Sequence, residues 1–262
     1  MSHVFNLRHQ WTPAQLGTLF WFDAADSATI TASAGAVSQW DDKSGNGYDV
    51  IQDVAADQPT TGSRTIGGLN VIDFSGVEAL RRTTDGPYAR NVGSLLVITL
   101  MQDDSLSSSD AQLEIKTAGG ATRVKHQTEG TRFSGAGRRL DSDSYQELDS
   151  TIIPDTNPHI HATIFDYSNA EMNWSIDGTL DTAQTYQTSG NTSDTDSTAF
   201  FIGAIDSTGT EGMNGAIGEM IVVEDDITTA TLQKLEGYIA WRWGRVSTLP
   251  SNHPYKNHPP YL

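Results

Sequence analysis

The chain is divided into short apolar runs separated by clusters of turn-forming residues. Runs of this length, rich in β-branched and aromatic side chains and bounded by Gly, Asn, Asp and Ser, are typical of β-strands joined by tight turns. The strand candidates are residues 19–22, 36–40, 69–74, 95–101, 200–202 and 217–223. The run at 95–101 is apolar nearly throughout, which predicts a central strand that is covered on both faces.

Two hairpins are expected in the middle of the chain. Residues 112–116 and 123–127 flank a turn that contains two glycines, and residues 159–165 lead through a polar turn into 172–176. The second hairpin ends at Asp177-Gly178, a pair that adopts positive φ at low cost.

One segment has the period of an α-helix. Between residues 231 and 243 the apolar side chains recur at spacings of three, four and four, which places them in one stripe, and a glycine follows as a left-handed cap. These residues are Leu232, Leu235, Ile239, Trp243 and Gly244. With many strands, one late helix and no strand–helix alternation, the chain is expected to be all-β. The predicted fold is a two-layer antiparallel β-sandwich of the jelly-roll type, with its one C-terminal helix packed on an edge or face.

Several motifs resemble those of concanavalin A-like, laminin-G-like jelly-roll domains of the bacterial and phage type. They are LFWFDAAD at 19–26, VSQWDDKSGNG at 37–47, VIDFSG at 71–76, WSIDG at 174–178 and LEGYIAWRWG at 235–244. The family often has an acidic residue directly after the glycine and isoleucine of the penultimate strand. Here that position is Gly218 and the acidic Glu219 follows it, so the resemblance does not include the family's calcium site. The resemblance implies one domain over residues 1–262, with a core sandwich at 10–250 and an extended, proline-rich tail at 251–262.

Charge limits the classes of partner. The chain has 16 Lys and Arg against 33 Asp and Glu, a net charge of −17, which disfavours nucleic acid and anionic membranes as partners. It has no cysteine, so thiol chemistry is excluded. The first ten residues have no apolar run of signal length, and the run at 95–101 is too short to span a bilayer, so we expect neither export by the usual route nor membrane insertion.

No catalytic pattern is present, and we predict that the chain is not an enzyme. Jelly-roll glucanases place two glutamates and an aspartate at alternating positions of one strand, and the nearest segment here, Glu147-Leu148-Asp149, lacks the second glutamate. Glu219 and Glu224 are five residues apart, so they are expected on opposite strand faces as exposed charges. His159 and His161 share a face but lack a third metal ligand, which favours a structural or surface pair.

Calcium is the one cofactor for which the chain offers candidate ligands. Four hard oxygen-bearing side chains lie close together in a glycine-containing loop: Asp41, Asp42, Asn46 and Asp49. The alternative is that these side chains cap their own backbone in a solvated turn.

The aromatic residues fall into three groups. Trp21, Trp40, Trp174 and Trp243 lie on apolar faces and are expected in the core. Tyr88, Tyr145, Tyr167 and Tyr186 lie in loop-like segments and are the candidates for a glycan-binding platform. In the tail, Tyr255 and Tyr261 are candidate assembly contacts, unless the tail folds back on its own domain.

The resemblance and the expected lack of export together predict a non-enzymatic bacteriophage virion protein. It would decorate the particle or serve as a head- or tail-associated adhesion domain, binding other virion proteins and host surface polysaccharide, as a homo-oligomer or part of a larger assembly. The alternative is a carbohydrate-binding module of a secreted bacterial protein, at the cell surface or outside the cell.

Overall fold

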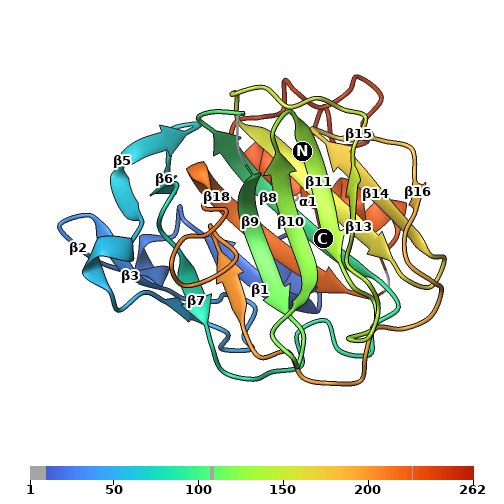
Figure 1. Ribbon diagram of the computed structural model, residues 1–262. Helices are drawn as coiled ribbons and strands as arrows, with labels where there is room; N and C mark the ends of the chain where they lie inside the picture. The colour runs from blue at the N-terminus through green and yellow to red at the C-terminus, as the bar shows by residue number, and fades with distance from the viewer. Residues whose placement is uncertain (1–9, 107–108, 226) are drawn as a thin grey trace.

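The computed structural model describes residues 10–106, 109–225 and 227–262, and every pairing between its named strands is antiparallel (Figure 1). The strands form two stacked sheets, one of which carries a single C-terminal α-helix on its outer face. This confirms the predicted all-β sandwich with one late helix. Within these residues, no helix is long and apolar enough to cross a membrane.

The back sheet is built around two long central strands that pair with each other along most of their length. In order across the sheet, its strands are β14 (Glu171–Ile176), β13 (His159–Asp166), β8 (Leu95–Asp103) and β18 (Asn214–Glu224). The free side of β18 pairs first with β6 (Leu69–Ser75) and then with β1 (Thr18–Asp23). Two short strands extend β14, namely β15 (Thr179–Leu180) and β16 (Gln184–Thr185).

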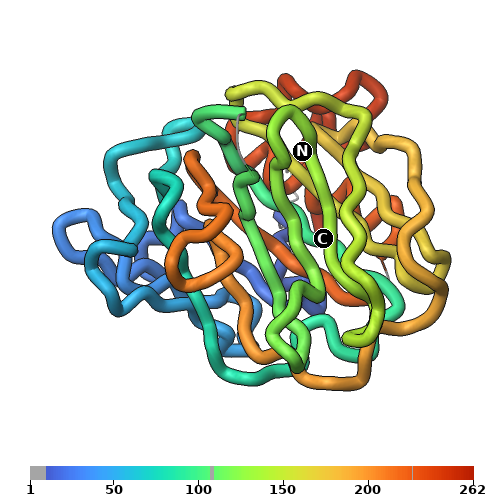
Figure 2. Tube along the Cα trace, viewed as in Figure 1, coloured from blue at the N-terminus to red at the C-terminus, as the bar shows by residue number. Residues whose placement is uncertain are grey.

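The front sheet contains the first predicted hairpin at its centre. Its strands, in order, are β7 (Leu80–Arg82), β17 (Phe200–Ile202), β9 (Ser109–Lys116), β10 (Thr122–Glu129), β11 (Arg132–Gly137) and β12 (Gln146–Asp149). Four further strands join the two sheets at one side of the molecule, where Figure 2 shows them in blue to cyan. They are β2 (Ile30–Ser33), β3 (Ala36–Trp40), β4 (Val50–Ile51) and β5 (Thr60–Ile66).

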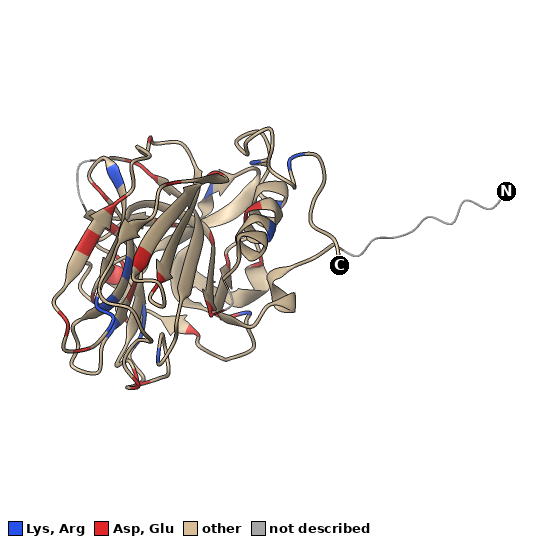
Figure 3. Cartoon of the chain, turned by 90° about the vertical axis from the view of Figure 1, so that its right-hand side faces the viewer, with Lys and Arg blue, Asp and Glu red and all other residues tan. Residues whose placement is uncertain are grey.

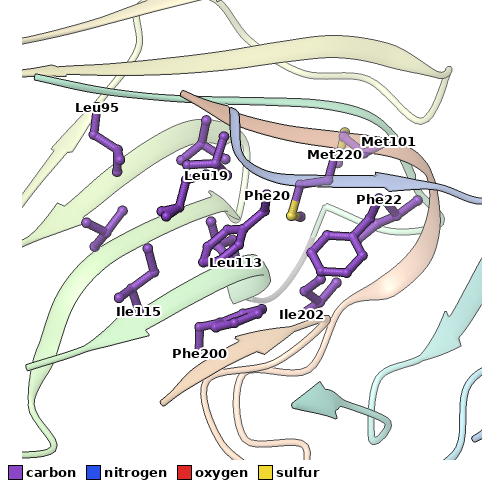
Figure 4. Packing of buried hydrophobic residues seen from close by; sticks show 14 of the residues in the cluster. Leu19, Phe20, Phe22, Leu95, Met101, Leu113, Ile115, Phe200, Ile202 and Met220 are labelled. Carbon is purple, nitrogen blue, oxygen red and sulfur yellow. The ribbon is translucent and has the colours of Figure 1, made fainter. Parts of the chain in front are cut away.

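The apolar run of β8 serves two hydrophobic cores, as its lack of alternation predicted. Leu95, Val97 and Met101 face the core between the sheets, whereas Leu96 and Ile98 face the core under the helix. Figure 4 shows the first core, in which aromatic side chains of β1 pack against β17. The rings of Phe20 and Phe200, for example, stack with centroids 4.2 Å apart.

Helix α1 (Thr229–Arg242) lies across the outer face of the back sheet and forms a third layer (Figure 3). All four residues of its predicted apolar stripe are buried. The side chain of Thr228 accepts a hydrogen bond from the N–H of Thr231 and so caps the first turn. At the other end Gly244 has φ of +66°, and the N–H of Arg245 bonds to the carbonyl of Ala240, a Schellman cap.

The tail was expected to be extended, and this expectation is wrong. Residues 251–262 form turns that pack on the helix side of their own domain. The indole of Trp241 donates to the carbonyl of Tyr255 at 2.8 Å, and Tyr261 pairs with Gln10 in an isolated bridge. A polar contact helps to hold the tail against the helix: His253 is buried, and its imidazole lies 3.1 Å from the carboxylate of Glu236. Tyr255 and Tyr261 therefore contact their own domain, as the alternative interpretation stated.

Candidate functional site

The outer face of the front sheet is polar, in contrast to the helix-covered face of the back sheet. In the register of β9 to β12, Glu114, Lys125, Ala136 and Glu147 stand opposite one another in one row across four strands. Their neighbours along each strand, such as Leu113 in β9, point into the core between the sheets. The alternation of strand side chains therefore gathers charged groups on this outer face.

An open hollow of about 370 Å³ lies on this face. It is lined by Lys125 and Glu129 of β10, by Tyr145 and Glu147 at β12, and by Glu211 from the loop after β17. Figure 1 shows this loop in orange beside β9, and its Gly212 forms an isolated bridge with Ala111 of that strand. The hollow thus combines residues that are far apart in sequence.

The lysines on this face form ion pairs with their neighbours. Lys125 is nearly buried and donates to Glu211 at 2.8 Å. Lys116 donates to Glu114 at 2.7 Å, and the hydroxyl of Thr122 donates to the same carboxylate at 2.6 Å. Burial raises the pKa of Glu114, and these two donors oppose the shift. Neither lysine is therefore a free cation for a ligand.

Tyr145 is the aromatic side chain of the hollow and is 38% exposed. Its hydroxyl donates to Glu147 at 2.8 Å, which fixes the orientation of the ring. Burial, and then the adjacent Glu147 carboxylate, raise the pKa of Tyr145, so the phenol stays neutral. A half-exposed ring beside carboxylates offers an apolar surface next to hydrogen-bond acceptors.

Gln127 connects the two carboxylates at the rim of the hollow. Its amide nitrogen donates to Glu147 at 3.1 Å and lies 3.5 Å from Glu129. The side chain of Gln127 is fully buried, and its Oε1 has no hydrogen-bond partner. Arg132 is the register neighbour of Glu129, yet in the described part of the chain neither Glu129 nor Glu147 has a cationic group within 4.0 Å. The donors to these two carboxylates are therefore neutral: the amide of Gln127 for both, and the hydroxyl of Tyr145 for Glu147.

Only one of the four tyrosines proposed as a glycan platform is exposed. Tyr88, Tyr167 and Tyr186 are fully buried, and the assignment of these three to a binding surface is wrong. Tyr88 packs between Phe20 and Phe200, and the other two pack against Phe165. Their segments are loops, as predicted, but the loops close the ends of the sandwich and place the rings in its core.

The proposed calcium loop is a set of backbone caps, as the alternative interpretation stated. Asp42 accepts hydrogen bonds from the backbone of Trp21, Ser44 and Tyr48, and Asp49 accepts one from the N–H of Asp42. The remaining two candidates are also engaged: Asn46 donates to the carbonyls of Thr18 and Leu19, and Asp41 accepts from Gln39. Among the residues that the structure describes, no group of three or more His, Asp or Glu is placed to hold a metal ion. The loop therefore does not support calcium binding.

Glu219 is fully buried, so its assignment as an exposed charge is wrong. A bulge at Gly218 redirects β18, and a Cβ at this glycine would lie 2.9 Å from the ring of Trp243. Glu219 then lies under the helix, where burial, together with the nearby Asp23 carboxylate, raises its pKa to about 7. Glu224 is partly buried and accepts a hydrogen bond from the N–H of Ala89 at 2.7 Å.

Of the two alternatives, a structural or a surface pair, the contacts of the histidine pair favour the structural one, and a third histidine that the sequence did not reveal joins it. His159 donates to Asp177 at 2.8 Å, whereas His161 is buried and its ring stacks on that of His126 at 3.9 Å. His126 of the front sheet lies 2.8 Å from the hydroxyls of Thr99 and Thr163, which belong to the back sheet. Its side chain therefore bridges the two sheets.

No family model matches the chain, and no curated protein matches it. Solved structures of β-sandwich binding domains do match the chain. The binding domain of botulinum neurotoxin DC, in complex with rat synaptotagmin II, has a TM-score of 0.57 at 9% identity over 84% of this chain and 51% of its own. The CBM40 of the Ruminococcus gnavus IT-sialidase, bound to α2,3-sialyllactose, has a TM-score of 0.52 at 15% identity over 62% of this chain and 94% of its own.

The ligand-binding domain of botulinum neurotoxin serotype D, in complex with N-acetylneuraminic acid, has a TM-score of 0.53 at 11% identity over 84% of this chain and 50% of its own. The chain thus spans about half the length of the neurotoxin domains it matches. At these identities the likeness establishes the β-sandwich fold. The three structures described are carbohydrate- or receptor-binding domains.

Proposed function

We propose that this chain is a glycan-binding β-sandwich domain with no catalytic role, and that the outer face of the front sheet is its binding face. The observation that carries the proposal is Tyr145, a half-exposed ring held beside the hollow by its hydrogen bond to Glu147. A sugar presents an apolar ring face and a rim of hydroxyl donors. A tyrosine ring bordered by carboxylate acceptors complements both.

The structural neighbours support binding over catalysis. Two of them were solved with sialyllactose or N-acetylneuraminic acid, and a further one, from botulinum neurotoxin C, is described as depending on two ganglioside molecules for cell entry. That structure has a TM-score of 0.55 at 10% identity. In the present chain, Asp149 is held by the hydroxyl of Ser134, so the strand that carries Glu147 and Asp149 does not present a pair of free carboxylates.

The setting we propose is the outer surface of a bacteriophage particle, where the domain contacts other virion proteins and binds host polysaccharide. Two observations support it: the resemblance of the motifs to phage and bacterial domains, and the net charge of −17, which keeps like-charged particles dispersed. A carbohydrate-binding module of a secreted bacterial protein is the second candidate, because it needs the same binding face. Mass spectrometry of purified particles separates the two: detection of the chain in intact virions supports the first, and its presence only in culture supernatant supports the second.

The binding proposal is tested with a panel of bacterial surface glycans and plant and animal oligosaccharides. Tyr145→Ala should weaken binding of any positive glycan about tenfold or more, equivalent to about 1.4 kcal/mol. Tyr261→Ala is the matched control, since that tyrosine lies in the tail on the helix side. A panel with no binder would overturn the proposal, and so would binding that Tyr145→Ala leaves unchanged.

A further inference from the structure

The hollow at Tyr145 has an excess of carboxylates among its lining residues. Glu129, Glu147 and Glu211 line it against one lysine, Lys125, and that lysine is committed to Glu211. Arg138 lies near the ring of Tyr145, but its guanidinium donates to the carbonyls of Asp143 and Thr122, both at 3.0 Å. The one lysine of the lining is therefore paired within the protein, and carboxylates outnumber cationic groups three to one among the lining residues.

Glu129 and Glu147 have acceptor capacity that the protein does not use. Both contact the amide nitrogen of Gln127, and Glu147 also accepts from the hydroxyl of Tyr145. In the parts of the chain described above, neither carboxylate forms an ion pair, and each oxygen that accepts one hydrogen bond can accept a second. Beside them, the buried Oε1 of Gln127 accepts no hydrogen bond. Buried acceptors are nearly always satisfied in folded proteins, so Gln127, which contacts two carboxylates that line the hollow, lacks a donor.

A cationic group with several N–H donors would satisfy this arrangement. An ammonium group has three donors and a full charge, and its hydrogen bonds to carboxylates are about twice as strong as neutral ones. A ligand carboxylate, such as that of a sialic acid, would instead meet Glu129, Glu147 and Glu211 at close range and be repelled.

From these contacts we infer that the hollow binds glycans that carry a free amino group, that is, hexosamine units without the N-acetyl group. The inference rests on the proposed function and specifies its ligand. The sugar ring lies against Tyr145, and its ammonium group donates to Glu129 and Glu147. The domain thereby differs in ligand class from its sialic acid-binding structural neighbours.

The test compares two oligosaccharides that differ only in acetylation: short oligomers of β-1,4-linked glucosamine and of N-acetylglucosamine, with sialyllactose as the anionic probe. Calorimetry is done at about pH 5, more than two units below the pKa of about 7.7 of an α-amino group, so that the amine is protonated. We expect the glucosamine oligomer to bind about tenfold more tightly than its acetylated form, and sialyllactose not to bind.

Variants separate a specific ammonium contact from attraction to the net charge. Glu129→Gln and Glu147→Gln should each reduce the preference for the free amine several-fold, because each removes one charged acceptor. Glu171→Gln is the matched control: it makes the same change in charge at an exposed position of the back sheet and should leave the preference intact. Thermal melts verify that all three variants fold.

The outcomes are distinguishable. Equal losses in all three variants would show non-specific attraction and overturn the inference. Tyr145-dependent binding of neutral or sialylated glycans with no preference for the amine would also overturn it, while leaving the proposed function in place. Binding that requires added calcium would assign the carboxylates to a metal instead. If no glycan of any class binds, both proposals fail.

Discussion

Trp21 and Trp243 donate their indole N–H groups to the two oxygens of one buried carboxylate, that of Glu219, at 2.8 and 2.7 Å. Trp21 belongs to the back sheet and Trp243 follows the last turn of helix α1. Arg242 completes the contact by donating to Asp23, a buried carboxylate at the end of the same strand as Trp21. The third layer is thus attached to the sandwich by a polar junction as well as by its apolar stripe.

Replacing this carboxylate should weaken the attachment. Glu219→Gln keeps the size of the side chain but puts an amide N–H₂ opposite one indole N–H, leaving two buried donors without an acceptor. We expect a loss of about 1–3 kcal/mol in the free energy of unfolding, measured with urea. The exposed Glu171→Gln should change stability by less than about 0.5 kcal/mol. Equal stability of Glu219→Gln and the unmodified protein would contradict this role.

The helix stripe gives a second stability prediction. Leu235 is fully buried between helix and sheet, and Leu235→Ala should cost about 2–5 kcal/mol through lost burial and the cavity left behind. Leu180→Ala is the matched control, because that leucine is 52% exposed, and it should cost far less. Similar unfolding midpoints for the two variants would show that the helix does not share the core.

The apolar patterns predicted those strands and the helix that bury an apolar face of their own. They failed for strands that form only because neighbouring strands pair with them. The run in β8 and the stripe of α1 were identified from sequence, with the helix beginning two residues before the expected start at 231. Strand β11 was not, because its sequence RFSGAG lacks apolar alternation. It is a strand because β10 and β12 pair with both its edges, and at Gly135 a Cβ would lie 2.6 Å from the sulfur of Met172.

The same limit applies to the site. Tyr145 was named from sequence, but the residues that surround it come from β10 and from the loop after β17, and no local motif joins them. Tyr88 has the same loop-like setting as Tyr145 in the sequence, yet its ring is in the core. Only the packing of the loops distinguishes the two. The division of the chain into one domain, and its place on a virion, stay predictions.

Glu224 should make stability depend on pH. Burial raises its pKa in the folded protein to about 7 from 4.5, so the folded state holds the proton more tightly than the unfolded state. The protonated Glu224 therefore contributes to the free energy of unfolding fully below about pH 4.5, and this contribution is lost as the pH rises through 7. Glu224→Gln should therefore gain about 1–3 kcal/mol relative to the unmodified protein between about pH 5 and pH 8. A difference that is constant over this range would contradict the shift.

Burial of His126 should make the stability of the fold change with pH in the opposite direction. Burial lowers its pKa to about 3 from 6.5, so the neutral ring is retained in the folded state and stability is lost as the pH falls from 6.5 toward 3. The imidazole resonances of His126, followed by NMR, should not titrate between about pH 7.5 and pH 5. Titration of this ring near pH 6.5 in the folded protein would show that it is accessible to solvent.

The most direct measurement for the central claim, a glycan-binding outer face on the front sheet, is an NMR titration of the labelled protein with the tightest-binding glycan. The account predicts that amide shifts change in the row formed by Lys125, Ala136 and Glu147, and at Tyr145, while amides of helix α1 stay unperturbed. Shift changes confined to the helix side or to the ends of the sandwich, with the row on β10 to β12 unaffected, would contradict it.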